Sequence, residues 1–177
     1  KECQDQGVKP IIGVDGYLAI RTRHDKEARI DNVRSRIVLL AENIDGYKNL
    51  LKLVSASYLE GFYYKPRFDY ELLEQHCGGL IAISPSFSGD IVKALAGGNE
   101  KRAQELINWY KKTFGPEKFY LELTHHPEIG GHEEKMQKLI RFAEENNTSL
   151  IAAHDVYYLE PEDRSVRETL VSIQNNL

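Results

Sequence analysis

The chain has 177 residues, of which 41% are hydrophobic and 28% are charged, and its formal net charge is −4. A soluble chain of this length and composition can form one globular domain, which buries roughly 70% of the surface that its unfolded chain exposes. The negative charge argues against a domain that binds nucleic acid on its own, because such domains usually carry a basic face.

The two cysteines and the first residues of the chain bear on the compartment in which the protein is expected to work. Cys3 and Cys77 form no metal-ligand spacing, and two isolated cysteines predict a reducing, cytoplasmic compartment rather than a disulfide framework. No run approaches the roughly 18 apolar residues that a membrane span needs, so we expect no membrane partner. Residues 1–7 (KECQDQG) are too polar for a signal peptide and are typical of the end of a helix, so we expect a fragment of a longer chain.

Five short apolar runs are predicted to be β-strands. They are residues 10–14 (PIIGV), 37–41 (IVLLA), 80–84 (LIAIS), 119–123 (FYLEL) and 150–153 (LIAA). Their near-continuous hydrophobicity is typical of strands that are covered on both faces, as in parallel sheets.

Amphipathic segments between and after these strands are predicted to be helices. They comprise residues 45–58, a run from an Asn99 N-cap through Phe114, residues 133–146 and a last helix from about Pro161 to Ile173. The inward faces are expected to be Tyr47, Leu50, Leu51 and Val54 in the first helix and Met136, Leu139, Ile140 and Ala143 in the third. Strands that alternate with helices predict an α/β fold with right-handed crossovers.

Polar residues follow each predicted strand, where α/β folds bind their ligands. In chain order they are Asp15, then Glu42 and Asn43, then Ser84, Ser86 and Ser88, then Thr124, His125 and His126, then His154 and Asp155. Asp15, His126 and Asp155 would form a partial shell for Mg²⁺, Mn²⁺ or Zn²⁺, which could polarise a phosphate or activate water.

A purely structural interpretation of the same residues stays open. Strand-to-helix loops are polar in most proteins, and Asp is a common cap or turn residue. On this interpretation His125 and His126 belong to a surface loop before Pro127. Spacing alone therefore leaves a metal-dependent hydrolase as one alternative.

No other catalytic motif competes with this strand-end cluster. The sequence contains no phosphate-binding G-x-x-x-x-G-K-[ST] loop, no G-x-S-x-G nucleophile motif and no G-x-G-x-x-G after a strand. Residues 58–69 (YLEGFYYKPRFD) combine aromatic rings with Lys65 and Arg67, which could contact nucleotides. The same rings could instead pack against the sheet.

Five longer segments carry a family resemblance. They are residues 7–19 (GVKPIIGVDGYLA), 37–69 (IVLLAENIDGYKNLLKLVSASYLEGFYYKPRFD), 79–91 (GLIAISPSFSGDI), 119–126 (FYLELTHH) and 152–174 (AAHDVYYLEPEDRSVRETLVSIQ). In this order they resemble the PHP (polymerase and histidinol phosphatase) domain of bacterial replicative DNA polymerase III alpha subunits. GYKNLLKLVS and YLEGFYYKPR resemble that polymerase branch rather than PHP phosphatases at large.

The resemblance implies a distorted (βα)7 TIM-like PHP barrel, of which residues 1–177 would be a partial, amino-terminally truncated single domain. The family's His-x-His motif would lie before Lys1, and the polymerase core would lie beyond residue 177. PHP domains that keep a metal centre hold up to three metal ions through His, Asp, Glu and sometimes Cys. Some of them hydrolyse phosphoesters or act as exonucleases on DNA ends.

Three expected ligand positions of the family differ here. Where the family often has His, this chain has Arg36, whose guanidinium is always protonated and cannot bind a metal. The position of an expected Cys is Ser86, and that of the terminal His of the last motif is Tyr157. His154 lies beside a lost ligand position and could compensate for it in principle, but successive residues at a strand end point to opposite sides.

Three positions can still bind a metal ion. His126 matches the His of the fourth strand's end, Asp155 keeps the Asp of the last motif, and Asp15 replaces an expected Glu with a shorter carboxylate. The resemblance therefore implies a degenerate metal shell of Asp15, His126 and Asp155. No cofactor is expected in this fragment, while Zn²⁺ or Mn²⁺ would be expected if the centre survives.

The resemblance also implies a function. The parent chain would be a DNA-directed DNA polymerase that uses Mg²⁺ and reaches DNA through its other domains. This domain would be an inactive scaffold that docks a proofreading exonuclease subunit and other replicase subunits. Two alternatives stay open: an active metal-dependent phosphoesterase or proofreading 3′–5′ exonuclease, and a free-standing PHP phosphatase.

Overall fold

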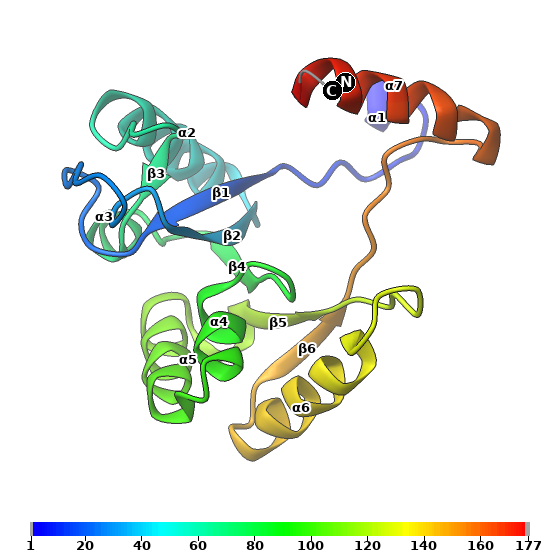
Figure 1. Cartoon of the computed structure of the whole chain (residues 1–177). Helices are drawn as coiled ribbons and strands as arrows, with labels where there is room; N and C mark the ends of the chain where they lie inside the picture. The colour runs from blue at the N-terminus through cyan, green and yellow to red at the C-terminus, as the bar shows by residue number, and fades with distance from the viewer. Residues whose placement is uncertain (1, 176–177) are drawn as a thin grey trace.

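The computed structural model describes residues 2–175, so the two ends of the predicted domain, Lys1 and residues 176–177, lie outside the described residues. One sheet has the strand order β3-β1-β2-β4-β5-β6 (Figure 1). The strands are β1 (Gly13–Ala19), β2 (Arg34–Ala41), β3 (Arg67–Phe68), β4 (Leu80–Ser84), β5 (Phe119–Leu123) and β6 (Ser149–Ala152). The helices are α1 (Glu2–Asp5), α2 (Ile44–Leu59), α3 (Tyr70–Gln75), α4 (Asp90–Ala96), α5 (Glu100–Phe114), α6 (His132–Glu145) and α7 (Arg164–Asn175).

Capping side chains set where the long helices begin. The side chain of Asn43 accepts hydrogen bonds from the backbone N–H groups of Asp45 and Gly46 at the start of α2, at 3.0 and 2.9 Å. Asn99 accepts from the backbone N–H of Arg102 at 3.0 Å and confirms the predicted start of α5. Each cap satisfies backbone donors that the first turn of a helix leaves unpaired.

The predicted all-parallel sheet is wrong at β2. Strands β4, β5 and β6 are parallel, but β2 runs antiparallel to both β1 and β4. The connection from β1 to β2 contains no helix, so it makes no right-handed crossover. Glu42 and Asn43 therefore lie at the opposite end of the sheet from the carboxyl ends of β4, β5 and β6. Asp15 lies inside β1, opposite Val38, rather than after it.

The helices cover one face of the sheet only, so the prediction that both faces are covered is also wrong for the described chain. Helix α2 contacts β1, β2 and β4, α5 contacts β4 and β5, and α6 contacts β6. Ile37 and Leu39 point into this covered core and are fully buried. Their neighbours Arg36 and Val38 alternate onto the other face, where they are only half-buried. We call this second surface the open face.

The sheet is not closed, and β3 and β6 form its two edges. In a closed barrel the open face would be the interior, because strands of a barrel turn alternate residues inward. The structure therefore confirms the predicted class, a partial TIM-like α/β barrel.

The predicted inward stripe of α2 is displaced. Leu50 is buried as expected, but Tyr47 and Leu51 are exposed, and the buried positions are Gly46, Leu50, Leu53 and Ser57. Gly46 lies against the backbone of Gly79, where a Cβ would come within 1.9 Å of the Gly79 carbonyl oxygen. This close approach allows only glycine at position 46 and places the buried stripe of the helix on Gly46, Leu50, Leu53 and Ser57. In α6, Met136, Leu139 and Ala143 are buried as expected, together with Phe142.

Asp90 joins three helices inside the core. Its carboxylate accepts hydrogen bonds from the hydroxyl groups of Tyr70 and Tyr110, both at 2.8 Å. Tyr70 begins α3, Asp90 begins α4, and Tyr110 lies in α5. Burial raises the pKa of the Asp90 carboxyl above its ordinary value, and the two tyrosine hydrogen bonds oppose that rise.

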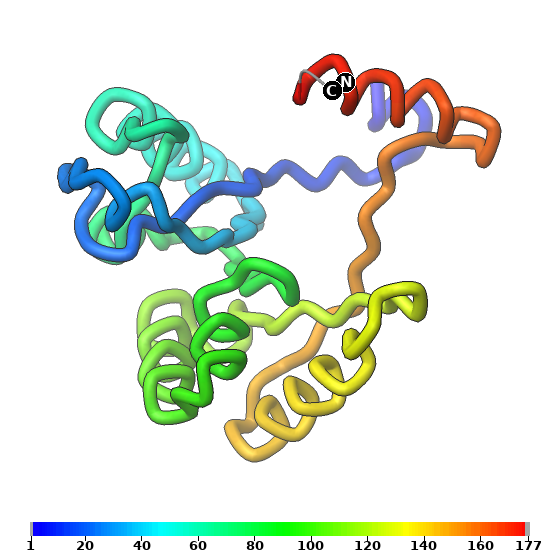
Figure 2. Tube along the Cα trace, viewed as in Figure 1, coloured from blue at the N-terminus to red at the C-terminus, as the bar shows by residue number. Residues whose placement is uncertain are grey.

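The last helix, α7, lies apart from the sheet at the end of an extended segment, residues 153–158 (Figure 2). Its apolar residues Val166, Leu170 and Ile173 are exposed, and within the described chain none of its residues is buried. No helix among residues 2–175 has both the length and the apolar character needed to cross a bilayer.

Arg67 fixes the long connection between β1 and β2. It is completely buried, and its guanidinium donates to four backbone carbonyl groups. The acceptors are Gly61 at 3.0 Å, Asp31 at 2.9 Å, Arg23 at 3.1 Å and Asp25 at 2.9 Å. Three of these carbonyls belong to the β1–β2 connection, so one side chain from β3 holds its course.

The aromatic stretch before Arg67 divides between two environments. The half-buried ring of Tyr63 lies 5.4 Å from the Arg67 guanidinium, which matches the packing interpretation. Tyr58, Phe62 and Tyr64 are instead exposed.

We predict that Arg67→Met lowers the free energy of unfolding by about 3 kcal/mol or more, because four carbonyl groups lose a buried donor. Urea unfolding followed by circular dichroism measures this loss. Arg102→Met is the matched control, since the Arg102 side chain is 50% exposed and forms an ion pair with Glu105 on the same helix. A loss below about 1 kcal/mol in Arg67→Met would contradict the role assigned to Arg67.

Candidate functional site

The candidate site lies where the open face meets the carboxyl ends of β4, β5 and β6. Because these three strands are parallel, the residues after them gather at one end of the sheet. Strand β2 reaches the same place from the opposite direction. The backbone N–H of Arg36 donates to the carbonyl of Ser88 at 2.8 Å, which fastens β2 to the loop after β4.

Arg36 and Asp15 form an ion pair across β1 and β2. Arg36 lies opposite Tyr17 and therefore diagonal to Asp15 on the open face. Its Nε donates to Asp15 Oδ1 at 3.0 Å, and its Nη2 donates to Asp15 Oδ2. The hydrogen bond with Asp15 raises the pKa of Arg36, and the charges of Asp155 and Glu122 raise it further. The site therefore carries a negative field that one fixed positive charge partly neutralises.

Ser86 and Glu122 form a second hydrogen-bonded pair. Ser86 is buried, and both its backbone N–H and its hydroxyl donate to Glu122 Oε1, at 3.1 and 2.9 Å. The Ser86 hydroxyl also lies 2.9 Å from that of Thr124. Sequence reasoning missed Glu122. The available signal was a lone carboxylate in the apolar run FYLEL, at a position that alternates onto the open face.

Three imidazole rings gather beside these pairs. The rings of His126 and His154 stack at a centroid separation of 5.2 Å, and His132 meets His126 edge-on at 5.3 Å. The prediction that His154 points away from the site is wrong. Strand β6 ends at Ala152, so the alternation of strand side chains no longer governs residue 154.

The ring nitrogen atoms of His126 and His132 differ in their hydrogen-bond partners. His126 Nδ1 lies 3.0 Å from Glu128 Oε1, whereas His126 Nε2 is buried and has no hydrogen-bond partner among residues 2–175. His132 is buried, and its Nε2 lies 3.0 Å from the carbonyl oxygen of Thr124. His132 is the first residue of α6, and its side chain faces inward.

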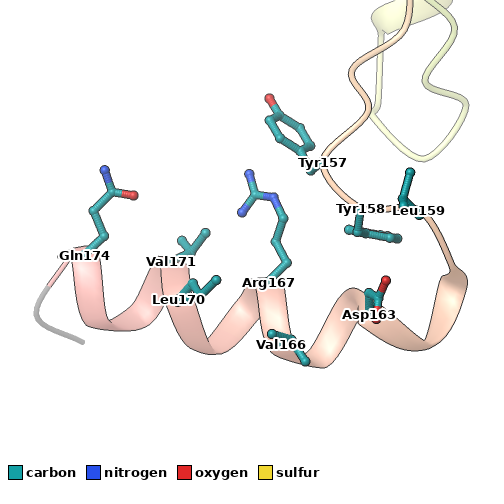
Figure 3. A pocket seen from close by; sticks show the side chains of 9 residues that line it. All are labelled: Tyr157, Tyr158, Leu159, Asp163, Val166, Arg167, Leu170, Val171 and Gln174. Carbon is teal, nitrogen blue, oxygen red and sulfur yellow. The ribbon is translucent and has the colours of Figure 1, made fainter. Parts of the chain in front are cut away.

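The three predicted metal-binding residues lie in different surroundings. Asp15 is held by Arg36, and Asp155 is exposed, with no hydrogen bond within the described chain. Tyr157 turns toward α7, where the Arg167 guanidinium lies 4.0 Å from its ring centroid (Figure 3). No group of three or more His, Cys, Asp or Glu side chains in residues 2–175 is placed to hold a metal ion.

These contacts test whether the site fits a resident divalent cation. Such an ion needs several converging oxygen or imidazole donors. Asp15 and Glu122 already bind protein donors, and only His126 Nε2 is buried and free of a partner in the described chain. The described residues therefore do not fit a tightly bound cation.

The Ser86 hydroxyl should contribute measurably to stability. We predict that Ser86→Ala lowers the free energy of unfolding by about 1–2 kcal/mol, because the half-buried Glu122 carboxylate loses a donor. Ser88→Ala, in the same loop, is the control, since the Ser88 side chain makes no hydrogen bond within the described chain. Equal effects of the two substitutions in denaturant titrations would contradict this account.

Comparisons with known proteins agree with the fold. A family model described as "PHP domain" matches residues 1–126. The chain is 39% identical to the DNA polymerase III subunit alpha of Borreliella burgdorferi over 174 residues and 39% identical to that of Aquifex aeolicus over 181 residues. Its identity to that of Treponema pallidum is 38% over 176 residues.

Each of these alignments covers 98% of the chain but only 15% of the relative. The chain thus spans a small part of the length of the curated relatives that it matches. Because the family model matches more than half of the residues, the chain belongs to the PHP domain family.

Proposed function

We propose that residues 1–177 are the PHP portion of a bacterial replicative DNA polymerase III alpha subunit that works in the cytoplasm. The observation that carries this proposal is the 38–39% identity to named alpha subunits over 98% of the chain. In this proposal the parent chain synthesises DNA with Mg²⁺. The fragment itself does not polymerise.

The proposed role of this domain is a scaffold with a degenerate metal shell of Asp15, His126 and Asp155. The bidentate contact of Arg36 on Asp15 supports the loss of metal binding, because a guanidinium cannot act as a ligand and repels a nearby cation. The turn of Tyr157 toward α7 supports it as well, since the family's terminal His would face the shell.

The scaffold would dock a proofreading exonuclease subunit, together with other replicase subunits. Support comes from an apolar cluster at the end of α2, formed by Tyr58, Leu59 and Phe62. Leu59 is 84% exposed, and the Tyr58 and Phe62 rings stack at 6.4 Å. Exposed aromatic and aliphatic groups of this kind are typical of the centre of a protein–protein interface.

One observation favours an active metal-dependent phosphoesterase or proofreading exonuclease instead. The buried Nε2 of His126 has no partner among residues 2–175, and the stacked His154 ring lies beside it. A partnerless imidazole nitrogen is a ready cation ligand. This alternative predicts turnover that depends on Asp155.

Activity separates the two functions. We expect the purified chain, supplied with Mn²⁺ or Zn²⁺, to release no nucleotide from the 3′ end of single-stranded DNA above the level of Asp155→Asn. In the full-length parent, Asp155→Asn should leave primer extension unchanged, because Asp155 is an exposed residue outside the polymerase core. Digestion by the wild-type chain that Asp155→Asn abolishes would establish the alternative.

Docking can be tested on one helix. We predict that Leu59→Asp in the full-length parent weakens binding of the exonuclease subunit by roughly tenfold or more, because a charge enters the apolar cluster. Ile44→Asp is the matched control, since Ile44 is exposed at the other end of α2. Equal affinities of both variants and the wild type in calorimetric titrations would exclude this docking surface.

A further inference from the structure

We infer that Arg36 is a built-in counter-ion, which takes the role of a bound cation on the open face and balances Asp15, Glu122 and Asp155. This inference deepens the proposed degenerate metal shell and rests on it. In this inference the domain has lost metal binding because the Arg36 guanidinium replaces the metal ion and stabilises the domain in its place.

The first step is the rigidity of Arg36. Its backbone N–H is fixed by the Ser88 carbonyl at 2.8 Å, and its guanidinium is fixed by Asp15. Its side chain is 33% exposed and that of Asp15 is 49% exposed, so the pair lies at the edge of solvent rather than free in it. An arginine whose backbone and guanidinium are both held keeps its charge in one place.

The second step is the surrounding charge. The carboxylate of Asp15 accepts both hydrogen bonds of the Arg36 guanidinium, Glu122 lies on the open face of β5, and Asp155 follows the carboxyl end of β6. Like charges gathered on one surface repel one another, and a cation among them relieves that repulsion. In metal-binding proteins a divalent ion supplies this positive charge, whereas here the guanidinium supplies it without leaving the chain.

The third step is the engagement of the donor atoms. Both oxygens of Asp15 accept from Arg36, and Glu122 Oε1 accepts from the backbone and hydroxyl of Ser86. A cation would have to displace these protein donors before it could bind. Arg36 therefore both stabilises the carboxylates and excludes a metal ion.

The experiment uses the whole chain with Arg36→Gln, a neutral side chain of similar reach. Thermal unfolding is followed in EDTA and then in MnCl2. We expect Tm in EDTA to be about 2–4 °C below that of the wild type. Mn²⁺ at roughly ten times its dissociation constant should raise Tm of the variant by about 3 °C and leave that of the wild type unchanged.

Arg34→Gln is the matched control. Arg34 lies on the same face of the same strand, its guanidinium lies 4.9 Å from the centre of the Tyr17 ring, and no carboxylate pairs with it in the described chain. Its substitution should create no response to Mn²⁺. The double variant Asp15→Asn with Arg36→Gln should also show no Mn²⁺ response. In this variant the carboxylate that would bind Mn²⁺ in place of Arg36 is absent.

The outcomes separate this inference from the function on which it rests. If neither the wild type nor Arg36→Gln responds to Mn²⁺, the counter-ion inference is wrong while the degenerate shell stands. If the wild type responds as strongly as the variant, the degenerate shell itself is wrong. Should Arg36→Gln fail to fold, Arg36→Lys decides: it keeps the charge, so it should fold and show no Mn²⁺ response, and a response would overturn the inference.

Discussion

Strand β2 runs against both of its neighbours, and the arrangement of charge on the open face depends on that direction. Because β2 is antiparallel to β4, its first residues lie at the end of the sheet where β4, β5 and β6 finish. If β2 were parallel to them, its last residues would lie there instead. Arg36 can therefore bind Asp15 on β1 with its side chain and Ser88, in the loop after β4, with its backbone. A single reversed strand thus brings a fixed cation to the rim that, in α/β folds, holds ligands.

The scaffold that positions this rim is held by buried polar contacts as well as by the apolar core. Arg67 ties the β1–β2 connection to β3, and Asp90 ties α3, α4 and α5 to one another. Removing one partner from such contacts leaves a buried polar group unsatisfied, which costs more than the contact itself contributes. The buried contacts of Arg67 and Asp90 therefore help to fix the strands and loops that carry the side chains of the site.

Local signals in the sequence predicted much of the fold. The bounds of β4 and β5 and the Asn99 cap of α5 could be predicted because continuous apolar runs and capping residues act over a few neighbours. The direction of β2 could not, since the side-chain alternation of a strand is the same in parallel and antiparallel sheets. The face of α2 was misplaced because the contact of Gly46 with Gly79 joins distant segments.

The candidate site was predicted in part. The family resemblance indicated Arg36, Ser86 and Tyr157 as replaced positions, but it could not show that Arg36 binds Asp15 or that Ser86 binds Glu122. Those partners are set by register across strands, which one sequence does not contain. His154 was assigned to the wrong side because β6 ends before it.

The central claim is that this PHP domain balances its carboxylates internally and holds no resident metal. The most direct test is elemental analysis of the purified chain after growth with Mn²⁺ and Zn²⁺ and extensive dialysis. We predict no stoichiometric metal in the wild-type chain. One or more tightly held ions per chain, lost on Asp15→Asn, would contradict the claim and restore a working metal centre to this rim.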